Sequence, residues 1–529
     1  MPAWKVCAEQ ANDGYDASGN DIQNAFRTER IITMNSLSQL PEQYSDQEAR
    51  MQSDTALTLE QIEQYGLMLF TDQHALEWAR FPVRGHYETH RLRSKAFRNW
   101  LTREFHRRGE PTSQQKIKHL IALLEAFAEE ERRELSNRSA WDAEQQSLWI
   151  DLCDDLWRAV RVSSEGWAIE TNPPSLFRRF AHQRELPIPE HGGDLNELWE
   201  YLPPLASDGD RLLLMAWLIT ALMPIPRPIL TLIGPHGSAK STFSTFLRRL
   251  LDPSRVELLG RDTRTDLPLI FDKHAVPVFD NTDGMTPLEA DLFCQAVTGR
   301  GIARRKLYTD ADEFILSFKR AIILNGLRLP TNRPDFLDRA LILDVERLSP
   351  ERRQVLEQVE RAFMEARPRL LGALLTMLSR VLSVMPVVSR EGLSRMADFH
   401  LMGRAVAEAM GATSAQFDDA FAQAESRQKR GAFDNTLALS LLLFAQQVRR
   451  WQGDATNLLQ RLHETAKANQ IRQSPEFWPD TPMALGRQLK HLGDSLARNG
   501  VRVSKVRRAT ARLISLEYDP AADRLGDDE

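Results

Sequence analysis

The stretch "RPILTLIGPHGSAKST", residues 227–242, decides how the rest of the chain is interpreted. An apolar run with β-branched residues comes first, and the amphipathic pattern "STFSTFLRRLL" follows a loop that contains glycines. A buried strand, such a loop and a helix together place backbone N–H groups and a helix N-terminus where they can hold phosphate. The loop matches the Walker A pattern, except that Ala239 stands at the position of the second glycine. The alternative is a chance loop of glycine, serine and lysine.

The loop residues have separate expected roles. We expect Lys240 to reach the β- and γ-phosphates of ATP and Ser241 to hold Mg²⁺. A methyl group at Ala239 fits if φ stays negative, because only a left-handed conformation disfavours a β-carbon. We therefore expect a negative φ there and a working ATP site. The predicted nucleotide-binding loop consists of Gly234, Pro235, His236, Gly237, Ser238, Ala239, Lys240, Ser241 and Thr242.

A later apolar strand, "HAVPVFDN", ends in a second candidate for magnesium binding. Asp280 stands at its carboxyl end, where it is expected to hold Mg²⁺ through water. The alternative for Asp280 is a turn former at the end of a strand. Asn281 follows, where an acidic residue usually activates the attacking water; an amide orients water but cannot accept its proton. Asp283 or Asp291 are the candidates to replace that acid.

The segment "GIARRKLYTDADEFILSF" alternates like two paired strands, with "TDAD" as the turn. Its cations are expected to contact DNA, and the alternative is a solvated run of charge. The next strand, "RAIILN", ends in Asn325, and Arg339 directly precedes the strand "ALILDV". The three cations of the predicted hairpin are Arg304, Arg305 and Lys306.

This order of motifs resembles the superfamily 3 helicases, a ring-forming branch of the AAA+ ATPases. It is most similar to the phage and plasmid primase-helicase ATPase domains of the poxvirus type, and the wider chain resembles ATP-binding proteins of bacterial mobile elements. The resemblance implies that Asn325 senses the γ-phosphate and positions water. It also implies that Arg339 is an arginine finger that reaches the ATP of the next subunit, and that the hairpin is the DNA-contacting loop. The chain departs from the family at Asn281 and at the acidic hairpin tip, and no primase motif is evident.

Composition limits the remaining function classes. The net charge of −5 provides no overall attraction to nucleic acid or membrane, so DNA binding requires local basic patches. The three cysteines are far apart in sequence and form no zinc-ligand pattern, which fits a reducing cytoplasm. The most apolar stretch, residues 212–226, is too short to span a membrane and is expected to be a buried helix. We therefore predict a cytoplasmic protein without a membrane partner.

The expected fold class is α/β, an AAA+ P-loop core with a mainly parallel sheet, flanked by other domains. The C-terminal sequence reads as helix, turn, helix and strand pair, typical of a winged-helix-like module, which binds either DNA or protein. Its predicted DNA contacts are Arg502, Lys505, Arg507 and Arg508. The predicted divisions are loosely ordered residues 1–60, a small α/β domain at 61–185, the ATPase core at 186–350, a helical region at 351–470, the winged-helix-like module at 471–518 and an acidic tail at 519–529.

These observations predict an ATP hydrolase that acts as a DNA helicase or translocase, working as a ring, expected to be a homo-hexamer, in the replication of a mobile element or phage. The alternative is a nucleotide-switched initiator, loader or defence ATPase that binds DNA without separating strands, which Asn281 favours. A metabolic P-loop kinase is a third, weaker interpretation, because it leaves Asn325 and Arg339 unexplained.

Overall fold

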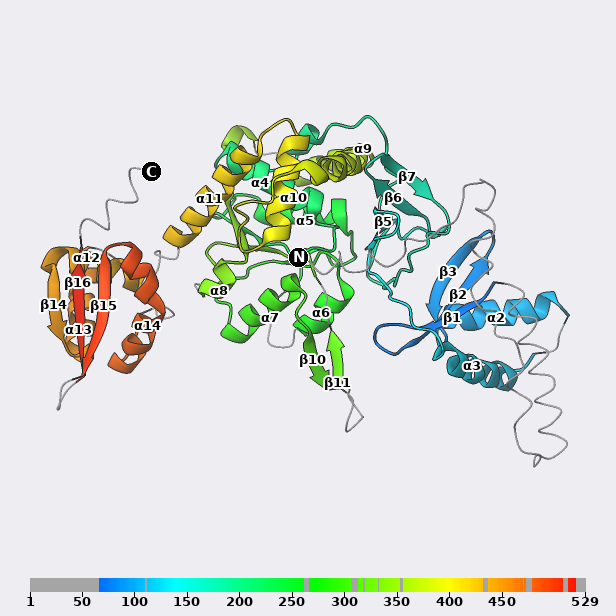
Figure 1. Cartoon of the computed structure of the whole chain (residues 1–529), viewed down its shortest axis with the longest axis horizontal. Helices are drawn as coiled ribbons and strands as arrows, with labels where there is room; N and C mark the ends of the chain where they lie inside the picture. The colour runs from blue at the N-terminus through cyan, green and yellow to red at the C-terminus, as the bar shows by residue number, and fades with distance from the viewer. Residues whose placement is uncertain are drawn as a thin grey trace, which may run out of the picture. The chain divides into compact units, whose positions relative to one another are not determined.

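The structure is a computed structural model, and it describes residues 66–519 apart from 110–111, 261–265, 306–312, 317–318, 332, 353–354, 432–435, 470, 472–477 and 508–511. It contains several sheets and many helices (Figure 1). The expectation of loose order at residues 1–60, the acidic tail from 520 onward, and the cations Lys306 and Arg508 lie outside the described residues.

The central sheet has the strand order β13-β8-β12-β9, and every neighbouring pair is parallel. Its strands are β8 (Ile229–Ile233), β9 (Val278–Phe279), β12 (Ile323–Gly326) and β13 (Ala340–Asp344). Because helices connect successive parallel strands, the carboxyl ends of all four strands lie along one edge of the sheet. The prediction of a mixed α/β fold with a parallel sheet is confirmed.

Both faces of this sheet are buried, which explains why its strands are apolar without strict alternation. Leu230 and Leu232 pack into one hydrophobic cluster with three helices, whereas Ile229 packs into a second cluster with two others. The first three helices are α4 (Asp208–Thr220), α5 (Lys240–Leu251) and α9 (Leu356–Val384), and the other two are α6 (Leu267–Lys273) and α7 (Pro287–Thr298). The predicted buried helix in residues 212–226 is α4, which is confirmed from Asp208 to Thr220.

One predicted strand, "RVELLG" at residues 255–260, does not form. The segment makes a single bridge to the sheet, between Leu259 and Phe279. The carbonyl of Glu257 instead accepts a hydrogen bond from the guanidinium of Arg248, at 2.8 Å. At the bridge to the sheet, Leu259 donates to the carbonyl of Val278 at 2.8 Å and accepts from the N–H of Asp280 at 3.2 Å.

The region before the central sheet contains two separate antiparallel sheets rather than one small domain. The first holds β1 (Met68–Thr71), β2 (Glu77–Val83) and β3 (His86–Arg91), followed by α2 (Lys95–Arg107) and α3 (Gln114–Ala128). The second holds β4 (Ser139–Asp142), β5 (Ser147–Asp151), β6 (Ala159–Ser163) and β7 (Gly166–Glu170). Leu148 and Val160 of the second sheet join the hydrophobic cluster of α4, α5 and α9, so this sheet packs with the core.

Helix α9 is long and apolar enough to cross a membrane by length and composition, and half of its most apolar window is buried inside the protein. Its buried residues include Phe363, Leu370 and Leu374, which lie in the same cluster as α4 and α5. Burial in the core therefore accounts for the apolar composition of α9.

The predicted hairpin after α7 is present as β10 (Ile302–Arg305) paired antiparallel with β11 (Glu313–Leu316). The C-terminal elements are α11 (Ser414–Gly431), α12 (Thr436–Val448), β14 (Arg450–Gly453), α13 (Ala455–Ala468), α14 (Pro482–Arg498), β15 (Val501–Arg507) and β16 (Arg512–Tyr518). Helix α14 is continuous, so the turn expected within it is wrong. The antiparallel sheet β14-β16-β15 draws β14 into this module, whose hydrophobic core therefore begins near Leu437 rather than at 471.

Candidate functional site

The loop between β8 and α5 lies at the carboxyl edge of the central sheet, where the sequence places it. Gly234 follows β8 directly, and a β-carbon there would clash with the carbonyl oxygen of Val345. Gly237 has φ +78°, in the left-handed region that favours glycine. Both glycines are therefore required by the backbone path of the loop.

Ala239 contradicts the expectation of a negative φ. Its dihedral angles are φ 58° and ψ 28°, so it is left-handed at the N-cap of α5. The loop needs this conformation to turn into the first residue of the helix, Lys240, and a β-carbon in such a position costs roughly 1–2 kcal/mol. The loop thus keeps the backbone shape of a glycine at this position while carrying a methyl group.

The ammonium group of Lys240 folds back onto its own loop. It donates hydrogen bonds to the carbonyl oxygens of Gly234 (2.7 Å) and Pro235 (3.0 Å) and to the hydroxyl of Ser238 (3.2 Å). Partial burial lowers the pKa of Lys240, and the carboxylates of Asp280 and Asp283 oppose that shift. A cation held inside a ring of loop carbonyls is positioned to exchange them for phosphate oxygens.

Ser241 and Asp280 meet across the loop. The Ser241 hydroxyl lies 3.2 Å and 3.3 Å from the two carboxylate oxygens of Asp280. Hydroxyl and carboxylate oxygens are the hard ligands that Mg²⁺ prefers, and Mg²⁺ is usually held by one or two such groups together with water and phosphate. The residues present therefore fit the cation that the sequence implies.

Two asparagines complete this edge of the sheet. Asn281 is left-handed, with φ 54°, and its N–H donates to the Asp280 carboxylate at 3.0 Å and to the Asn325 amide oxygen at 3.4 Å. Asn325 is only 1% exposed, and its amide nitrogen donates to the hydroxyl of Ser244 at 3.0 Å. The Asn325 amide is thus oriented from both sides.

These groups surround a cavity of about 300 Å³. Its lining consists of His236, Gly237, Ser238, Ala239, Lys240, Ser241, Thr242, Asp280, Asn281, Asn325, Gly326 and Leu327. The structure therefore brings together the predicted loop, Asp280, Asn281 and Asn325. Of the two substitute acids, Asp283 is near enough to influence Lys240, whereas Asp291 pairs with Arg333 at 2.8 Å.

Two residues of this site were not predicted. Ser244, one helical turn after Lys240, orients Asn325. Arg347 is exposed beyond the end of β13, and its Nε lies 4.0 Å from the position that a β-carbon on Gly237 would take. The motif order could have suggested Ser244 through its helical spacing, but nothing in the sequence links Arg347 to the loop.

Arg339 lies away from this cavity in the same chain. Its carbonyl accepts from the N–H of Ile229, the first residue of β8, at 2.7 Å, which puts it at the amino edge of the sheet. Five strand residues at about 3.3 Å each separate that edge from the loop. The guanidinium of Arg339 donates to the carbonyl of Asp335 at 2.6 Å. Its predicted role in another subunit stays a prediction.

The predicted DNA contacts fall on two separate elements. Arg304 and Arg305 belong to β10 of the hairpin, where they pair in register with Phe314 and Glu313. Arg502 is exposed on β15, which also carries Lys505 and Arg507.

Two family models match the chain. Residues 200–423 match the actinomycete integrative conjugative element replication protein, and residues 437–524 match the AICE RepA C-terminal domain. The two matches indicate a replication protein of an integrative conjugative element. They lie in chain order and divide at the start of the C-terminal module, which the hydrophobic core also places near residue 437. The prediction of a protein for mobile-element replication is confirmed at this level.

Other comparisons are weaker. No curated protein matches the chain. Two structures of the NrS-1 C-terminal region, both of the A form without ligand, are 10% and 9% identical to it, and each alignment covers 88% of this chain and 98% of the other. Both have a TM-score of 0.38.

Proposed function

We propose that this replication protein is an ATP-driven DNA helicase or translocase of superfamily 3 type that works as a ring, in the cytoplasm. The observation that carries the proposal is the meeting of Lys240, Ser241 and Asp280 at one sheet edge. A lysine at the end of a glycine-containing loop, beside a serine hydroxyl and an aspartate carboxylate, is the arrangement by which P-loop ATPases bind a triphosphate with its magnesium. The family matches support a role in replication. The site supports the further proposal that ATP hydrolysis drives this role.

Each residue then has a role in hydrolysis. Lys240 binds the β- and γ-phosphates, while Ser241 and Asp280 are the residues that hold Mg²⁺. When bound, the cation neutralises charge that develops on the phosphate oxygens. Asn325, fixed by Ser244, orients the attacking water, and Asn281 supports that orientation without accepting a proton.

Stabilisation of the negative charge that develops in the transition state is assigned to Arg339 of a neighbouring subunit. Within one chain Arg339 stands at the opposite sheet edge from the loop, so it serves only a site completed by a second copy. Guanidinium groups supplied in this way stabilise the transferring phosphoryl group strongly. A ring of copies gives every site such a neighbour.

DNA contact is assigned to the hairpin and the C-terminal module. The elements of that module run helix, strand, helix, helix, strand, strand from α12 to β16, an order that supports a winged helix. Helix α14 and the β15–β16 pair carry most of its cations, so positive charge is concentrated locally in a chain of net charge −5. Local cations of this kind bind the nucleic-acid backbone by releasing counterions.

Mixing two inactive variants tests the shared site. Lys240→Ala removes phosphate binding, and Arg339→Ala removes the finger, so each protein alone should hydrolyse ATP at least a hundredfold more slowly than the unmodified chain. In a mixture, a Lys240→Ala copy still offers Arg339 to the intact loop of an Arg339→Ala neighbour. Partial recovery of ATPase activity on mixing supports the proposal. Lys118→Ala, an exposed lysine on α3, serves as the control for loss of a positive charge.

Asn281 favours a second candidate, a nucleotide-switched initiator or loader that hydrolyses ATP slowly. Its amide cannot act as the general base, and Asp283 is the nearest carboxylate that could replace it. A forked DNA substrate with one labelled strand separates the candidates. Release of the labelled strand with ATP supports the helicase, whereas ATP-dependent assembly on DNA without strand release supports the switch.

A further inference from the structure

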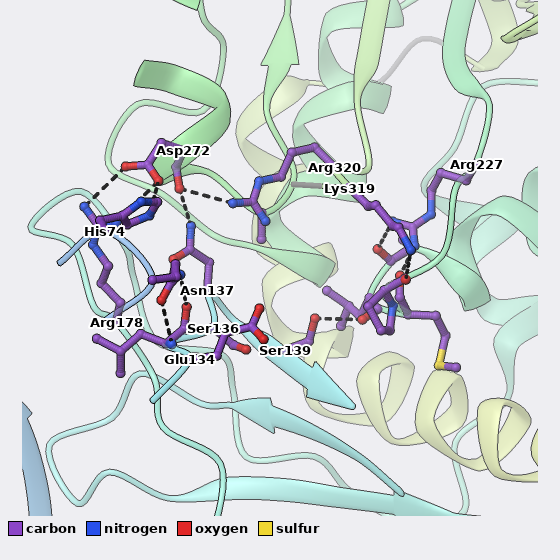
Figure 2. A pocket seen from close by; sticks show the side chains of 17 residues that line it. His74, Glu134, Ser136, Asn137, Ser139, Arg178, Arg227, Asp272, Lys319 and Arg320 are labelled. Atoms are coloured by element: carbon purple, nitrogen blue, oxygen red, sulfur yellow. Dashed lines mark hydrogen bonds and ion pairs between the residues drawn. The ribbon is translucent and has the colours of Figure 1, made fainter. Parts of the chain in front are cut away.

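A second cavity, of about 270 Å³, lies at the amino edge of the central sheet, away from the nucleotide loop. Figure 2 shows its walls, which come from the segment before β4, the turn between α4 and β8, the end of α6 and the link between β11 and β12. Its charged lining residues are Glu134, Arg178, Arg227, Asp272, Lys319 and Arg320, so four permanent cations face two carboxylates. The cavity therefore has an excess of positive charge.

The carboxylates do not balance these cations evenly. Asp272 pairs with Arg178 at 3.2 Å, and its backbone carbonyl accepts from Arg320, also at 3.2 Å. Arg227 donates only to the carbonyls of Ala221 and Met223, and Lys319 only to that of Pro224, at 3.3 Å. In the part of the chain that the structure describes, neither Arg227 nor Lys319 has a carboxylate partner.

Arg227 is the more informative of the two. Its side chain is 1% exposed, and its Nε has no hydrogen-bond partner within the described residues. Burial, followed by the positive charge of the nearby Arg320, lowers the pKa of Arg227 to about 9. A buried donor left unsatisfied destabilises the fold, and a charged one does so more strongly. Within the described residues the positive charge of Arg227 is therefore balanced by carbonyl dipoles and by no carboxylate.

We infer that this cavity binds a phosphate group. Guanidinium groups present N–H donors in a planar fork that suits phosphate oxygens, and a lysine adds a point charge. A phosphate here would neutralise Lys319 and offset the uncompensated positive charge of Arg227. The phosphate belongs either to a nucleic-acid strand or to a free phosphorylated molecule, because both present the same oxygens.

The cavity lies beside the segment that joins the hairpin to the central sheet, so a bound phosphate would contact this segment. Lys319 and Arg320 stand between β11 of the hairpin and β12, the strand that contains Asn325. A ligand that holds them therefore contacts the segment that joins the hairpin to the candidate ATP site. This inference does not depend on the proposed ATPase, because the cavity and the loop lie at opposite sheet edges.

The test uses full-length protein that carries Lys240→Ala, so that the nucleotide loop contributes little phosphate binding. Pyrophosphate is titrated by isothermal titration calorimetry into this protein and into the same protein with Lys319→Ala. Lys319 is exposed, so its replacement should leave the fold intact. We expect at least tenfold weaker binding after Lys319→Ala, most affinity retained in Lys319→Arg, and no change in Lys118→Ala.

A second arm identifies the source of the phosphate, by fluorescence anisotropy of a labelled single-stranded oligonucleotide with the same proteins. Weaker oligonucleotide binding in Lys319→Ala, with or without a pyrophosphate effect, assigns the phosphate to a strand. An effect on pyrophosphate alone assigns it to a free molecule. Equal binding by the two proteins in both arms, or no binding of either probe, overturns the inference. Failure of the ATPase proposal alone would leave these titrations unchanged.

Discussion

The hydroxyl of Ser241 lies 3.2 Å from one carboxylate oxygen of Asp280 and 3.3 Å from the other. The two residues are 39 positions apart and come from the start of α5 and the end of β9. The strands β8 and β9 are parallel and end at the same sheet edge, on either side of β12, which brings a serine after one strand to an aspartate after the other. The Ser241 hydroxyl and the Asp280 carboxylate therefore lie next to one another, and both are suitable ligands for Mg²⁺.

Asp280→Asn tests this pair. The amide keeps the size of the side chain and a hydrogen bond to Ser241, but it removes the negative charge that holds a divalent cation. We expect fluorescent ATP analogue to bind with an affinity that no longer depends on Mg²⁺, and ATP hydrolysis to fall at least a hundredfold. Anisotropy titrations with Mg²⁺ or with EDTA, together with phosphate release, measure both effects. Hydrolysis at the unmodified rate would remove Asp280 from the site.

Ala239→Gly is expected to stabilise the protein. Ala239 adopts φ 58°, which a glycine adopts without the steric cost of a β-carbon. The relief of roughly 1–2 kcal/mol is partly offset by the greater entropy of glycine in the unfolded chain, so we expect a net gain of about 0.5–1 kcal/mol. Urea unfolding followed by tryptophan fluorescence measures it.

The matched control is Ala362→Gly, at an exposed position inside α9. There the helix requires a negative φ, so the same chemical change should destabilise by about 1 kcal/mol. If the free energy of unfolding rises in Ala239→Gly and falls in Ala362→Gly, the gain is due to the left-handed conformation of Ala239. Equal losses in both variants would contradict that assignment.

Arg347→Ala is expected to weaken ATP binding without affecting the fold. Arg347 is exposed, makes no hydrogen bond or ion pair with the described residues, and lies beside Gly237 of the loop. A guanidinium there can reach a bound phosphate and form charge-assisted hydrogen bonds. We expect roughly tenfold weaker ATP binding, or about 1.4 kcal/mol, and an unchanged melting temperature.

Two companion variants isolate this effect. Arg347→Lys keeps the charge but not the fork, so it should recover part of the affinity. Arg380→Ala removes an exposed arginine from α9 and should leave ATP binding unchanged. If Arg347→Ala binds ATP as tightly as the unmodified chain, the residue is a solvated surface cation.

Local patterns predicted much of the fold and of the candidate site. The apolar runs that became β8, β12 and β13, and the loop that ends in Lys240, are contiguous features whose spacing is visible in sequence. The φ of Ala239 was predicted incorrectly because it depends on how the loop joins the helix, and not on the residue itself. Arg347 and the second cavity were missed because packing brings together segments that are far apart in the chain.

The failed strand at residues 255–260 has a cause of the same kind. Its sequence favours a strand, but the segment bridges the sheet at Leu259, and the Glu257 carbonyl bonds to the side chain of Arg248, nine positions earlier, which the pattern of apolar residues does not reveal. The same arginine links this segment to His274, with 2.7 Å between Nη2 of Arg248 and Nδ1 of the imidazole. Arg248 is fully buried, so its hydrogen bonds to Glu257 and His274 replace those that its guanidinium would make with water.

His274 makes stability depend on pH. Burial, followed by the positive charge of Arg248 and the neighbouring His182, lowers the pKa of His274 to about 3, against about 6.5 in an unfolded chain. Between these values the unfolded chain binds a proton that the folded protein does not. The contribution of His274 is therefore fully present above pH 6.5 and is lost as pH falls, by about 1.4 kcal/mol per pH unit.

His274→Gln separates this effect from the titration of carboxylates elsewhere. The glutamine amide oxygen can accept the hydrogen bond from Arg248 but does not titrate, so the variant should lose about 2 kcal/mol less stability than the unmodified chain between pH 7 and pH 5. Urea midpoints at pH 7, 6 and 5 for both proteins measure the difference between the slopes. Parallel slopes would mean that His274 takes up its proton over the same pH range in the folded protein as in the unfolded chain, which the contact with the Arg248 guanidinium opposes because both groups would then be cations.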